Sequence, residues 1–302
     1  MDVVEGNIWF FGPRSYEVWR TGSNPDLPFN KVGGTSSEIG CSAPNSISKI
    51  LNSVFWIGSS SAGNNTVFMS NGYTGTRISN HAIEYLLTTL STTDDAVSFT
   101  YQQNGHVFYV LTLVTGNKTI VYDVATGEWH ERTSRNPLTN ADNRWDPIFA
   151  TFAFNKVLVG TLANARILTL DLNKYTAWDG DPIVRLHQGP IQNENDQILF
   201  HREFVIDIET GIGLNSTNPN NSGIQSNQGV DPQIMLQYSD DSGHTWSSEQ
   251  WTTLGKAGEY STRARWRRLG RSRNRVYRME ISSPNKVVVI GARLSVDLGS
   301  DH

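Results

Sequence analysis

Residues 97–132, VSFTYQQNGHVFYVLTLVTGNKTIVYDVATGEWHER, carry the strongest fold signal in the chain. Turn residues at Asn104-Gly105, Gly116-Asn117 and Thr126-Gly127 interrupt runs of alternating or continuous apolar residues, which is typical of β-hairpins. We expect four antiparallel strands, over 97–101, 106–113, 119–123 and 128–131. Four such strands in about 40 residues match the size of one β-propeller blade.

Similar hairpins are predicted on both sides of this stretch. The expected strands are 7–11 with 15–19, 53–58 with 66–69 across a polar loop at 59–65, and a partial unit of 149–154, 157–160 and 166–171. The repeat lies in the strand pattern, since no strict sequence period is present. At about 40 residues per blade, residues 1–180 supply four blades at most. Whether the propeller is incomplete, and closed by a neighbour, is therefore left open.

One helix is predicted between these strands. Asn80 is a suitable N-cap, and Glu84 falls in the first turn, where a carboxylate suits the helix dipole. The apolar residues that follow have helical spacing: Ile83, Leu86, Leu87 and Leu90. We expect a short amphipathic helix packed against a sheet.

A domain boundary is predicted near residue 180, where breakers such as Gly180 and Pro182 precede a polar run at 192–196. We assign residues 1–180 to a β-propeller-like domain and residues 181–302 to a β-sandwich domain. The expected strands of the second domain are 197–209, 233–239, 249–254, 263–269, 275–282 and 286–296. The Gly-, Asn- and Ser-rich segment 210–231 is predicted to be a long loop.

Composition supports an all-β globular protein and excludes several classes. The 302 residues include 29 Ser, 26 Thr and 26 Asn, which favour turns and polar strand faces over helix interiors. Charged residues make only 18%, and the net charge is −4. No apolar run approaches the roughly 18 residues of a membrane span, and no signal-peptide core follows the acidic start, so neither is expected.

The sharpest local motif is SDDSGHTW, residues 239–246, which fits the Asp-box pattern S-x-D-x-G-x-T-W. The residues that define it are Ser239, Asp241, Gly243, Thr245 and Trp246. We expect the Asp241 carboxylate to accept backbone N–H groups within the turn, Gly243 to adopt a positive φ, and Trp246 to anchor the turn in the core. Asp boxes recur in sialidase-like propellers, but a single copy indicates a structural turn more than a glycosidase.

Eight arginines lie between residues 263 and 278. Arg263, Arg265 and Arg267 alternate along an expected strand, so they share one face, and Arg271 and Arg273 continue the series beyond a turn. These five are candidate subunit-interface residues, because the guanidinium fork binds carboxylates bidentately. A solvated face and direct contact with nucleic-acid phosphates are the alternatives.

Catalytic and metal motifs are not recognised in the sequence. The seven His lack metal-ligand spacing, and the single cysteine, Cys41, is interpreted as a buried thiol. There is no P-loop, no dinucleotide fingerprint and no G-x-S-x-G nucleophile motif. We therefore assign no catalytic, cofactor-binding or metal-binding residue.

Several segments, in order along nearly the whole chain, resemble one phage family. They are WFFG at 9–12, EVW at 17–19, EIGC at 38–41, SVFWIG at 53–58, YDVATGEWHER at 122–132, GEY at 258–260 and WRRLGRSRN at 266–274. Together they resemble the packaged-DNA stabilization proteins, the tail hub or nozzle proteins of P22-like podoviruses. Members of that family usually carry a longer region before the WFFG segment.

The resemblance implies a β-propeller followed by a β-sandwich, in a six-membered ring around a lumen that carries DNA. It also implies a location in the virion, contact with a head-to-tail adaptor, a tail needle or plug, and a tailspike or fibre, and no cofactor. We therefore expect a structural virion protein that helps to retain packaged DNA, and not an enzyme. The alternatives are a receptor- or glycan-binding propeller tail protein and, less favoured, a sialidase-like glycosidase.

Overall fold

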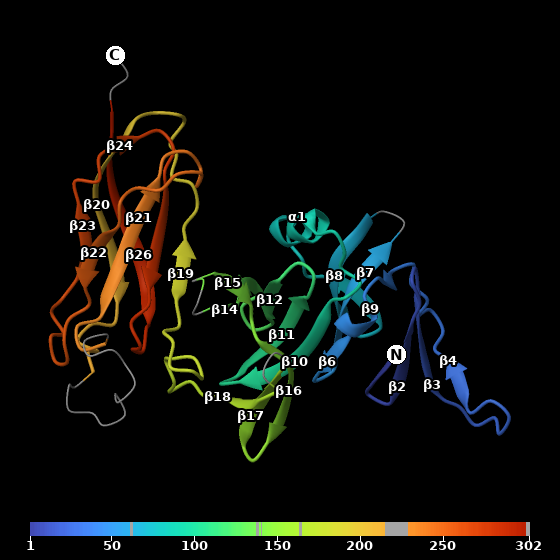
Figure 1. The fold of residues 1–302 in the computed structure, drawn as a ribbon. Coiled ribbons are helices and arrows are strands. Elements are labelled where there is room, and N and C mark those ends of the chain that lie inside the picture. Colours follow the sequence, from blue (N-terminus) through green and yellow to red (C-terminus); the bar gives the residue numbers. More distant parts are fainter. Residues whose placement is uncertain (61–62, 137–138, 140, 163–164, 215–228, 300–302) are drawn as a thin grey trace. The chain divides into compact units, whose positions relative to one another are not determined.

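The computed structural model describes residues 1–302 except 61–62, 137–138, 140, 163–164, 215–228 and 300–302 (Figure 1). The chain forms two compact units, Met1–Asp171 and Leu172–His302, whereas the sequence analysis divided it at 180/181. Apart from one α-helix and one 3-10 turn, Pro44–Ser46, the regular structure of the described residues is β. The expected all-β class is confirmed.

The N-terminal unit consists of successive antiparallel sheets, in which each sheet uses the next segment of the chain. The first sheet contains β1 (Asp2–Val4), β2 (Asn7–Phe11), β3 (Tyr16–Thr21) and β4 (Phe29–Lys31). The second contains β5 (Gly40–Cys41), β6 (Ser48–Ile50), β7 (Ser53–Ser60), β8 (Gly63–Asn71) and β9 (Thr74–Arg77). The third contains β10 (Val97–Gln103), β11 (His106–Leu113), β12 (Lys118–Asp123) and β13 (Glu128–Glu131). After a short ribbon of β14 (Thr133–Arg135) and β15 (Asp142–Arg144), the last sheet contains β16 (Pro147–Ala153), β17 (Lys156–Thr161) and β18 (Ile167–Leu170).

The four strands predicted over 97–132 are confirmed. β10, β11, β12 and β13 pair in sequence order, and Phe99, Val110, Val121 and His130 lie opposite one another across the sheet. The polar loop predicted at 59–65 was wrong, because β7 and β8 continue pairing to Ser60 and Gly63, past a register shift after Gly58. The backbone hydrogen bonds between two strands do not require apolar side chains. The polar side chains at these strand ends therefore gave no sign, in the sequence, that the pairing continues.

Successive sheets pack face to face, and each interface has its own apolar core. Trp9 and Val18 of the first sheet pack with Trp56 of the second. Phe55, on the opposite face of β7, stacks on Tyr109 of the third sheet with ring centroids 5.0 Å apart. The other face of the third sheet packs on the last sheet through Phe99, Val110, Val121, Val157 and Val159. The inner sheets are therefore apolar on both faces, because each strand alternates its side chains between two cores.

The predicted helix is confirmed as α1, His81–Thr89. The Asn80 Oδ1 accepts a hydrogen bond from the Ile83 backbone N–H at 3.0 Å, which caps the helix. Ile83 and Leu87 are buried in the core between the second and third sheets. In the part of the chain that the structure describes, no helix has the length and apolar character needed to cross a membrane.

The C-terminal unit is built from two antiparallel sheets around one core. One sheet has the order β19 (Arg185–Gln188), β25 (Val276–Ile281), β21 (Gln233–Ser239), β22 (Gln250–Thr253). In the other, β20 (Leu199–Ile208) pairs with β23 (Ala264–Arg267), β24 (Arg271–Ser272) and β26 (Val289–Leu298). Side chains from both sheets, among them Ile206, Ile234, Trp266 and Tyr277, fill the space between them. The short strands β19 and β24 were not predicted.

Most of the loop predicted at 210–231 lies outside the described residues, which exclude 215–228. The described residues on either side of it are joined by hydrogen bonds. The Leu214 backbone N–H donates to the Gly229 carbonyl at 2.6 Å. The buried Asn285 Nδ2 donates to the carbonyls of Ile212 and Gly229, at 2.8 and 3.0 Å. One side chain thus holds the two ends of the segment together.

Candidate functional site on the C-terminal unit

Strand β23 presents arginines on one face only. Ala264 and Trp266 are buried in the core, whereas Arg265 and Arg267 point outward, as strand alternation requires. Both arginines reach Glu203 on the neighbouring strand β20: the Glu203 Oε1 lies 2.9 Å from the Arg267 Nε and 3.5 Å from the Arg265 Nε. The hydrogen bond from Arg267 is the main reason why the pKa of Glu203 is lowered below its usual value.

Around Glu203 the surface forms a shallow depression of about 300 Å³, lined by Arg263, Arg265 and Arg293 together with Val205 and Leu294. Its positive charge is only partly compensated. The outward ion pairs of this sheet also include Arg293 with Asp207 at 3.0 Å and Arg202 with Asp297. Together with Arg263, these groups comprise five arginines and three carboxylates. We call this surface of β20, β23 and β26 the arginine face.

The predicted arginines do not all gather at one place. Arg263, Arg265 and Arg267 belong to the arginine face, whereas Arg271 lies on β24, opposite Phe200. Arg273 lies beyond β24 and donates a hydrogen bond to the Asp196 carbonyl. Glu203 and Arg293 were not predicted to lie here, because only strand pairing places β23 and β26 beside β20.

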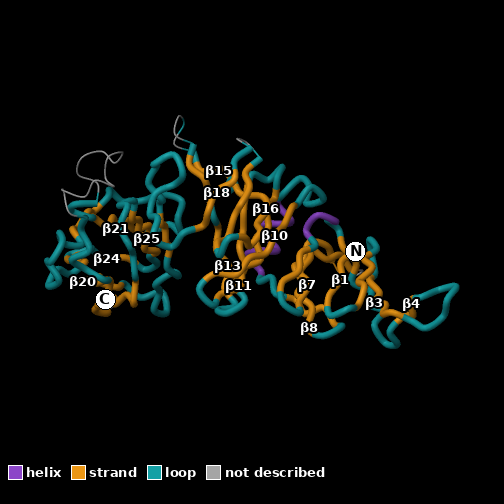
Figure 2. The backbone as a smooth tube through the Cα atoms, turned by 90° about the horizontal axis from the view of Figure 1, so that it is seen from below, coloured by secondary structure: helices purple, strands orange, loops and turns teal. Residues whose placement is uncertain are grey.

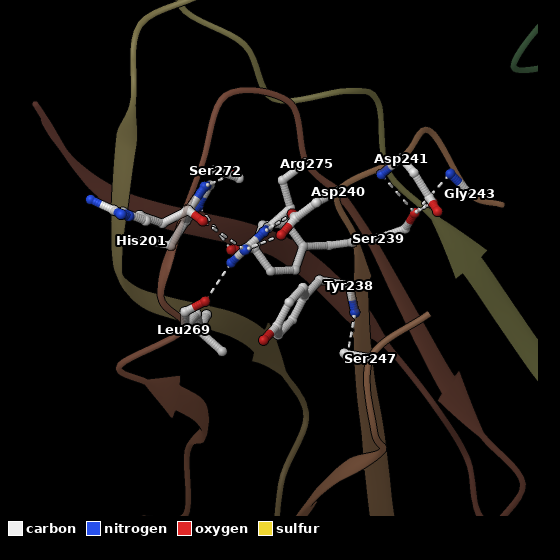
Figure 3. Close-up of polar contacts among 12 residues, drawn as sticks. His201, Tyr238, Ser239, Asp240, Asp241, Gly243, Ser247, Leu269, Ser272 and Arg275 are labelled. Atoms are coloured by element: carbon white, nitrogen blue, oxygen red, sulfur yellow. Dashed lines mark hydrogen bonds and ion pairs between the residues drawn. The ribbon is translucent and has the colours of Figure 1, made fainter. Parts of the chain in front are cut away.

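Arg275 differs from the other arginines because its side chain is only 2% exposed. Its guanidinium makes a two-pronged ion pair with Asp240, with Nε–Oδ1 and Nη2–Oδ2 distances of 2.6 and 2.8 Å, and donates to the Leu269 carbonyl at 2.5 Å (Figure 3). It also lies 3.9 Å from the centre of the Tyr238 ring, a cation–π contact. This ion pair between a buried arginine and a half-exposed aspartate was not singled out from the sequence, and it ties the end of β21 to the segment between β23 and β25.

A buried histidine lies next to this pair. His201 on β20 has its Nε2 2.8 Å from the Ser272 hydroxyl, and its Nδ1 2.9 Å from the Tyr277 hydroxyl. Burial, and then the positive charge of Arg275, lower the pKa of His201 to about 4. His201 is therefore neutral at pH 7, and its contacts stabilise the sandwich without adding charge.

The Asp-box residues form a closed turn after β21. The Asp241 Oδ1 accepts the Ser239 hydroxyl at 2.6 Å and the Thr245 backbone N–H at 2.8 Å, while its Oδ2 accepts the Thr245 hydroxyl at 2.6 Å. Gly243 has a φ of 97°, a region that favours glycine. The hydrogen bond from Ser239, followed by those from Thr245, holds the pKa of Asp241 far below its usual range.

Trp246 does not anchor this turn in the core, contrary to expectation. It is half-buried, and its ring lies against the Arg278 guanidinium, whose carbon is 4.1 Å from the ring centre. Because β21 and β25 pair with Gln237 opposite Arg278, the tryptophan lies over a polar row of the sheet. The Asp241 carboxylate is engaged entirely within the turn, so the motif acts here as a structural hairpin closure.

The geometry offers charged surfaces and buried polar pairs. Within the described ranges, no group of three or more His, Cys, Asp or Glu is placed to hold a metal ion. The side chains that the sequence analysis singled out lie in turns, in ion pairs or on the arginine face. Their arrangement is suited to binding a charged partner surface.

The fold, a unit of successive antiparallel sheets followed by a β-sandwich unit, is that of a two-domain all-β protein. A family model described as "Bacteriophage P22 Gp10, beta-propeller" matches residues 1–175, and one described as "Bacteriophage P22 Gp10, beta-sandwich" matches residues 185–297. The chain belongs to the bacteriophage P22 Gp10 family. The resemblance found in the sequence is thereby confirmed, as is the order of the two domains.

Two other comparisons add little. No curated protein matches the chain. Among solved structures, an exo-β-1,3-galactanase from Phanerochaete chrysosporium aligns with 97% of this chain and 67% of its own, at 9% identity and a TM-score of 0.24. A glycoside hydrolase family 43 arabinoxylan arabinofuranohydrolase from Bacillus subtilis aligns with 97% of this chain and 65% of its own, at 10% identity and a TM-score of 0.22. Scores this low carry no argument about activity.

Proposed function

We propose that the chain is a tail hub or nozzle component, which sits below a head-to-tail adaptor, helps to retain packaged DNA and forms part of the ejection conduit. The observation that carries the proposal is the pair of family matches, which spans both units. The role is mechanical and not catalytic. In the virion its partners are copies of itself in a ring, expected to be hexameric, the adaptor, a tail needle or plug, a tailspike or fibre, and DNA that passes without sequence readout.

The fold supports such a role in two ways. First, stacked sheets with a separate core between each pair make a stiff unit, since protein cores are close-packed and resist deformation. Second, the arginine face offers a partly uncompensated positive surface on a sheet, so it suits a carboxylate-bearing surface of a neighbouring subunit.

Charge reversal on the arginine face tests the assembly part of the proposal. The double variant Arg265→Glu with Arg267→Glu is expected to lower the fraction of rings at least tenfold at a fixed subunit concentration, while circular dichroism shows a folded monomer. Both side chains are exposed, so the core of the sandwich is not disturbed. Mass photometry counts the oligomers, and negative-stain imaging shows their symmetry.

The matched control reverses two exposed cations elsewhere, Arg14→Glu with Lys174→Glu, which makes the same change in net charge. This control should assemble like the parent protein. Equal ring fractions for the parent and the arginine-face variant would contradict the interface. Specific sugar binding on a glycan array would instead favour the alternative of a receptor-binding tail protein.

A further inference from the structure

One sheet of the C-terminal sandwich ends in a long strand, β26, whose outer edge has no partner (red in Figure 1). The inner edge of β26 pairs with β20 over Leu199–Ile208. No strand in the described ranges of the chain pairs with the outer edge. Both sheets belong to the C-terminal unit, so this free edge is a property of that unit alone. A free edge presents a row of backbone N–H and C=O groups that can bind a further strand.

β26 differs from the other edge strands of the sandwich in its weak protection against pairing. Short strands, prolines, unpaired charges and bulges are the devices that keep sheet edges from adding strands. The edge strands β19, β22 and β23 contain four residues each, whereas β26 contains ten and has no proline. Its two charged residues, Arg293 and Asp297, are each paired with a residue of β20. Two register shifts against β20 are the one such device that β26 has.

The apolar side of β26 is only partly covered by the opposite sheet. Figure 2 shows the two sheets as separate layers, with β21 and β25 in one and β20 and β24 in the other. Val296 and Leu298 lie opposite His201 and Leu199, which are buried, so their side chains point toward the opposite layer. Even so, Val296 is 38% exposed and Leu298 is 59% exposed. The sandwich therefore leaves apolar side chains uncovered beside the free edge.

The outward side of β26 determines the charge that a partner strand needs. Arg265 and Arg293 lie on either side of Val205, because β23 and β26 both pair with β20 at that residue. With Arg263 they line the depression on the arginine face, whose positive charge is only partly compensated. A strand added beside β26 would place its outward side chains next to Arg293, where carboxylates are favoured. Its inward side chains would lie next to Val296, where apolar groups are favoured.

We propose that the free edge of β26 binds an extended segment of a different protein, in which apolar residues alternate with acidic ones. The segment adds a strand to the sheet of β20, β23 and β26. Main-chain hydrogen bonds to β26 supply affinity, and the alternation of side chains supplies specificity. β26 itself does not have this pattern, since its outward side chains include Arg293, so a second copy of the strand is not the expected partner. The inference requires no ring and no contact with DNA, so it stands apart from the proposed function.

Binding of a model strand to the whole chain tests the proposal. The probe is a fluorescently labelled peptide in which valine and glutamate alternate, matched in length to β26. A twin peptide has the same sequence with N-methyl groups on alternate valines and alternate glutamates, which block hydrogen bonding along both of its edges. We expect the twin to bind about tenfold more weakly by fluorescence anisotropy. Backbone hydrogen exchange in residues 289–298 should slow when the unmethylated peptide is bound.

Two matched pairs of substitutions locate the contact. Val296→Lys with Leu298→Lys places inward-pointing charges on the edge strand, which opposes strand addition, and should weaken binding of the unmethylated peptide about tenfold. The control is Ile183→Lys with Leu186→Lys, which adds the same charge at apolar positions that are 39% and 55% exposed. The control should bind the peptide at least as well as the parent protein. Circular dichroism checks that both variants are folded.

Three results would overturn the proposal. Equal binding of the two peptides would mean that charge attracts them to the arginine face without strand pairing. Slower hydrogen exchange elsewhere, with residues 289–298 unchanged, would place the peptide at another site. Absence of binding by the unmethylated peptide would show that the free edge does not accept a strand of this pattern. If the lysine variant of β26 does not fold, the comparison of the two peptides and the hydrogen exchange still decide the matter in the parent protein.

Discussion

Arg275 shows why a side chain in an arginine-rich segment can be structural. Arg271 and Arg273, earlier in the same segment, are exposed, whereas Arg275 is enclosed by Asp240, Tyr238 and the Leu269 carbonyl. Burial by itself lowers the pKa of Arg275, but hydrogen bonds to Asp240 and Tyr277 more than offset it, so its pKa lies above the usual value. The arginine therefore remains charged inside the sandwich and depends on its partner.

Removing that partner's charge should destabilise the C-terminal unit. Asp240→Asn leaves the buried guanidinium without a carboxylate, and we expect the free energy of unfolding to fall by about 2 kcal/mol. The loss is smaller than for a fully buried ion pair, because Asp240 is half exposed to solvent. Urea denaturation followed by tryptophan fluorescence measures the change. Asp297→Asn is the matched control, because its partner Arg202 is exposed, and it should cost less than about 1 kcal/mol. Equal losses in the two variants would show that burial of Arg275 is not decisive.

The buried His201 predicts a pH dependence of stability. Its pKa of about 4 in the folded protein lies below the usual 6.5, so unfolding takes up a proton between these values. The stability that the protein gains by keeping His201 neutral is fully present above pH 6.5, and it is lost as the pH falls from 6.5 toward 4. The melting temperature of the parent protein should therefore fall over this range, and that of His201→Gln should fall less. Identical pH profiles would assign the acid sensitivity to other groups.

At the scale of elements, the capped helix α1 offers a local test. Asn80→Ala removes the acceptor for the Ile83 backbone N–H, and we expect a loss of about 1 kcal/mol in the free energy of unfolding. Asn80→Asp keeps an acceptor at the same position and should be nearly neutral. Chemical denaturation of the two variants compares them directly. A loss of the same size in both would mean that the side-chain cap contributes little.

Long and strongly patterned elements were predictable from the sequence. The strands over 97–132 and the helix at 81–89 appear where turn residues, alternation and capping predicted them, because those signals are local. Short strands such as β19 and β24 were not predicted, because they form only against distant partners: β19 pairs with β25, and β24 with β20. No window of four residues contains that information.

The candidate site followed the same division. Alternation alone placed Arg265 and Arg267 on one face of a strand. Glu203 and Arg293 joined them only through the pairing of β20 with β23 and of β20 with β26. The paired residues lie about 60 positions apart in the first case and about 90 in the second. Arg275 was counted only as one of the eight arginines between 263 and 278, because nothing in its own segment shows that Asp240 lies next to it. Trp246 was assigned to the core because size and apolarity were the only cues available.

At the scale of the whole molecule, the proposed conduit role predicts weak DNA binding, because it requires the chain to surround DNA without reading its sequence. The arginine face carries an excess of positive charge, but the chain as a whole has a net charge of −4. Attraction to DNA phosphates is therefore confined to that face. We expect a dissociation constant on the order of 10⁻⁴ to 10⁻⁶ M at physiological salt, weakening steeply as salt rises. Fluorescence anisotropy with duplexes of unrelated sequence measures both quantities. Tight, salt-insensitive and sequence-selective binding would contradict a passive conduit.

The joined ends of the 215–228 segment have an evolutionary consequence. Leu214 and Gly229 are hydrogen-bonded to each other, and Asn285 donates to the backbone on both sides, so the two ends of this connection are fixed to the sandwich. Lengthening a connection whose two ends are already held together costs little free energy, so we expect the strands to tolerate insertions between these two positions. Phages could therefore exchange or enlarge this segment as hosts and neighbouring virion parts diverge, without redesigning the domain that carries it.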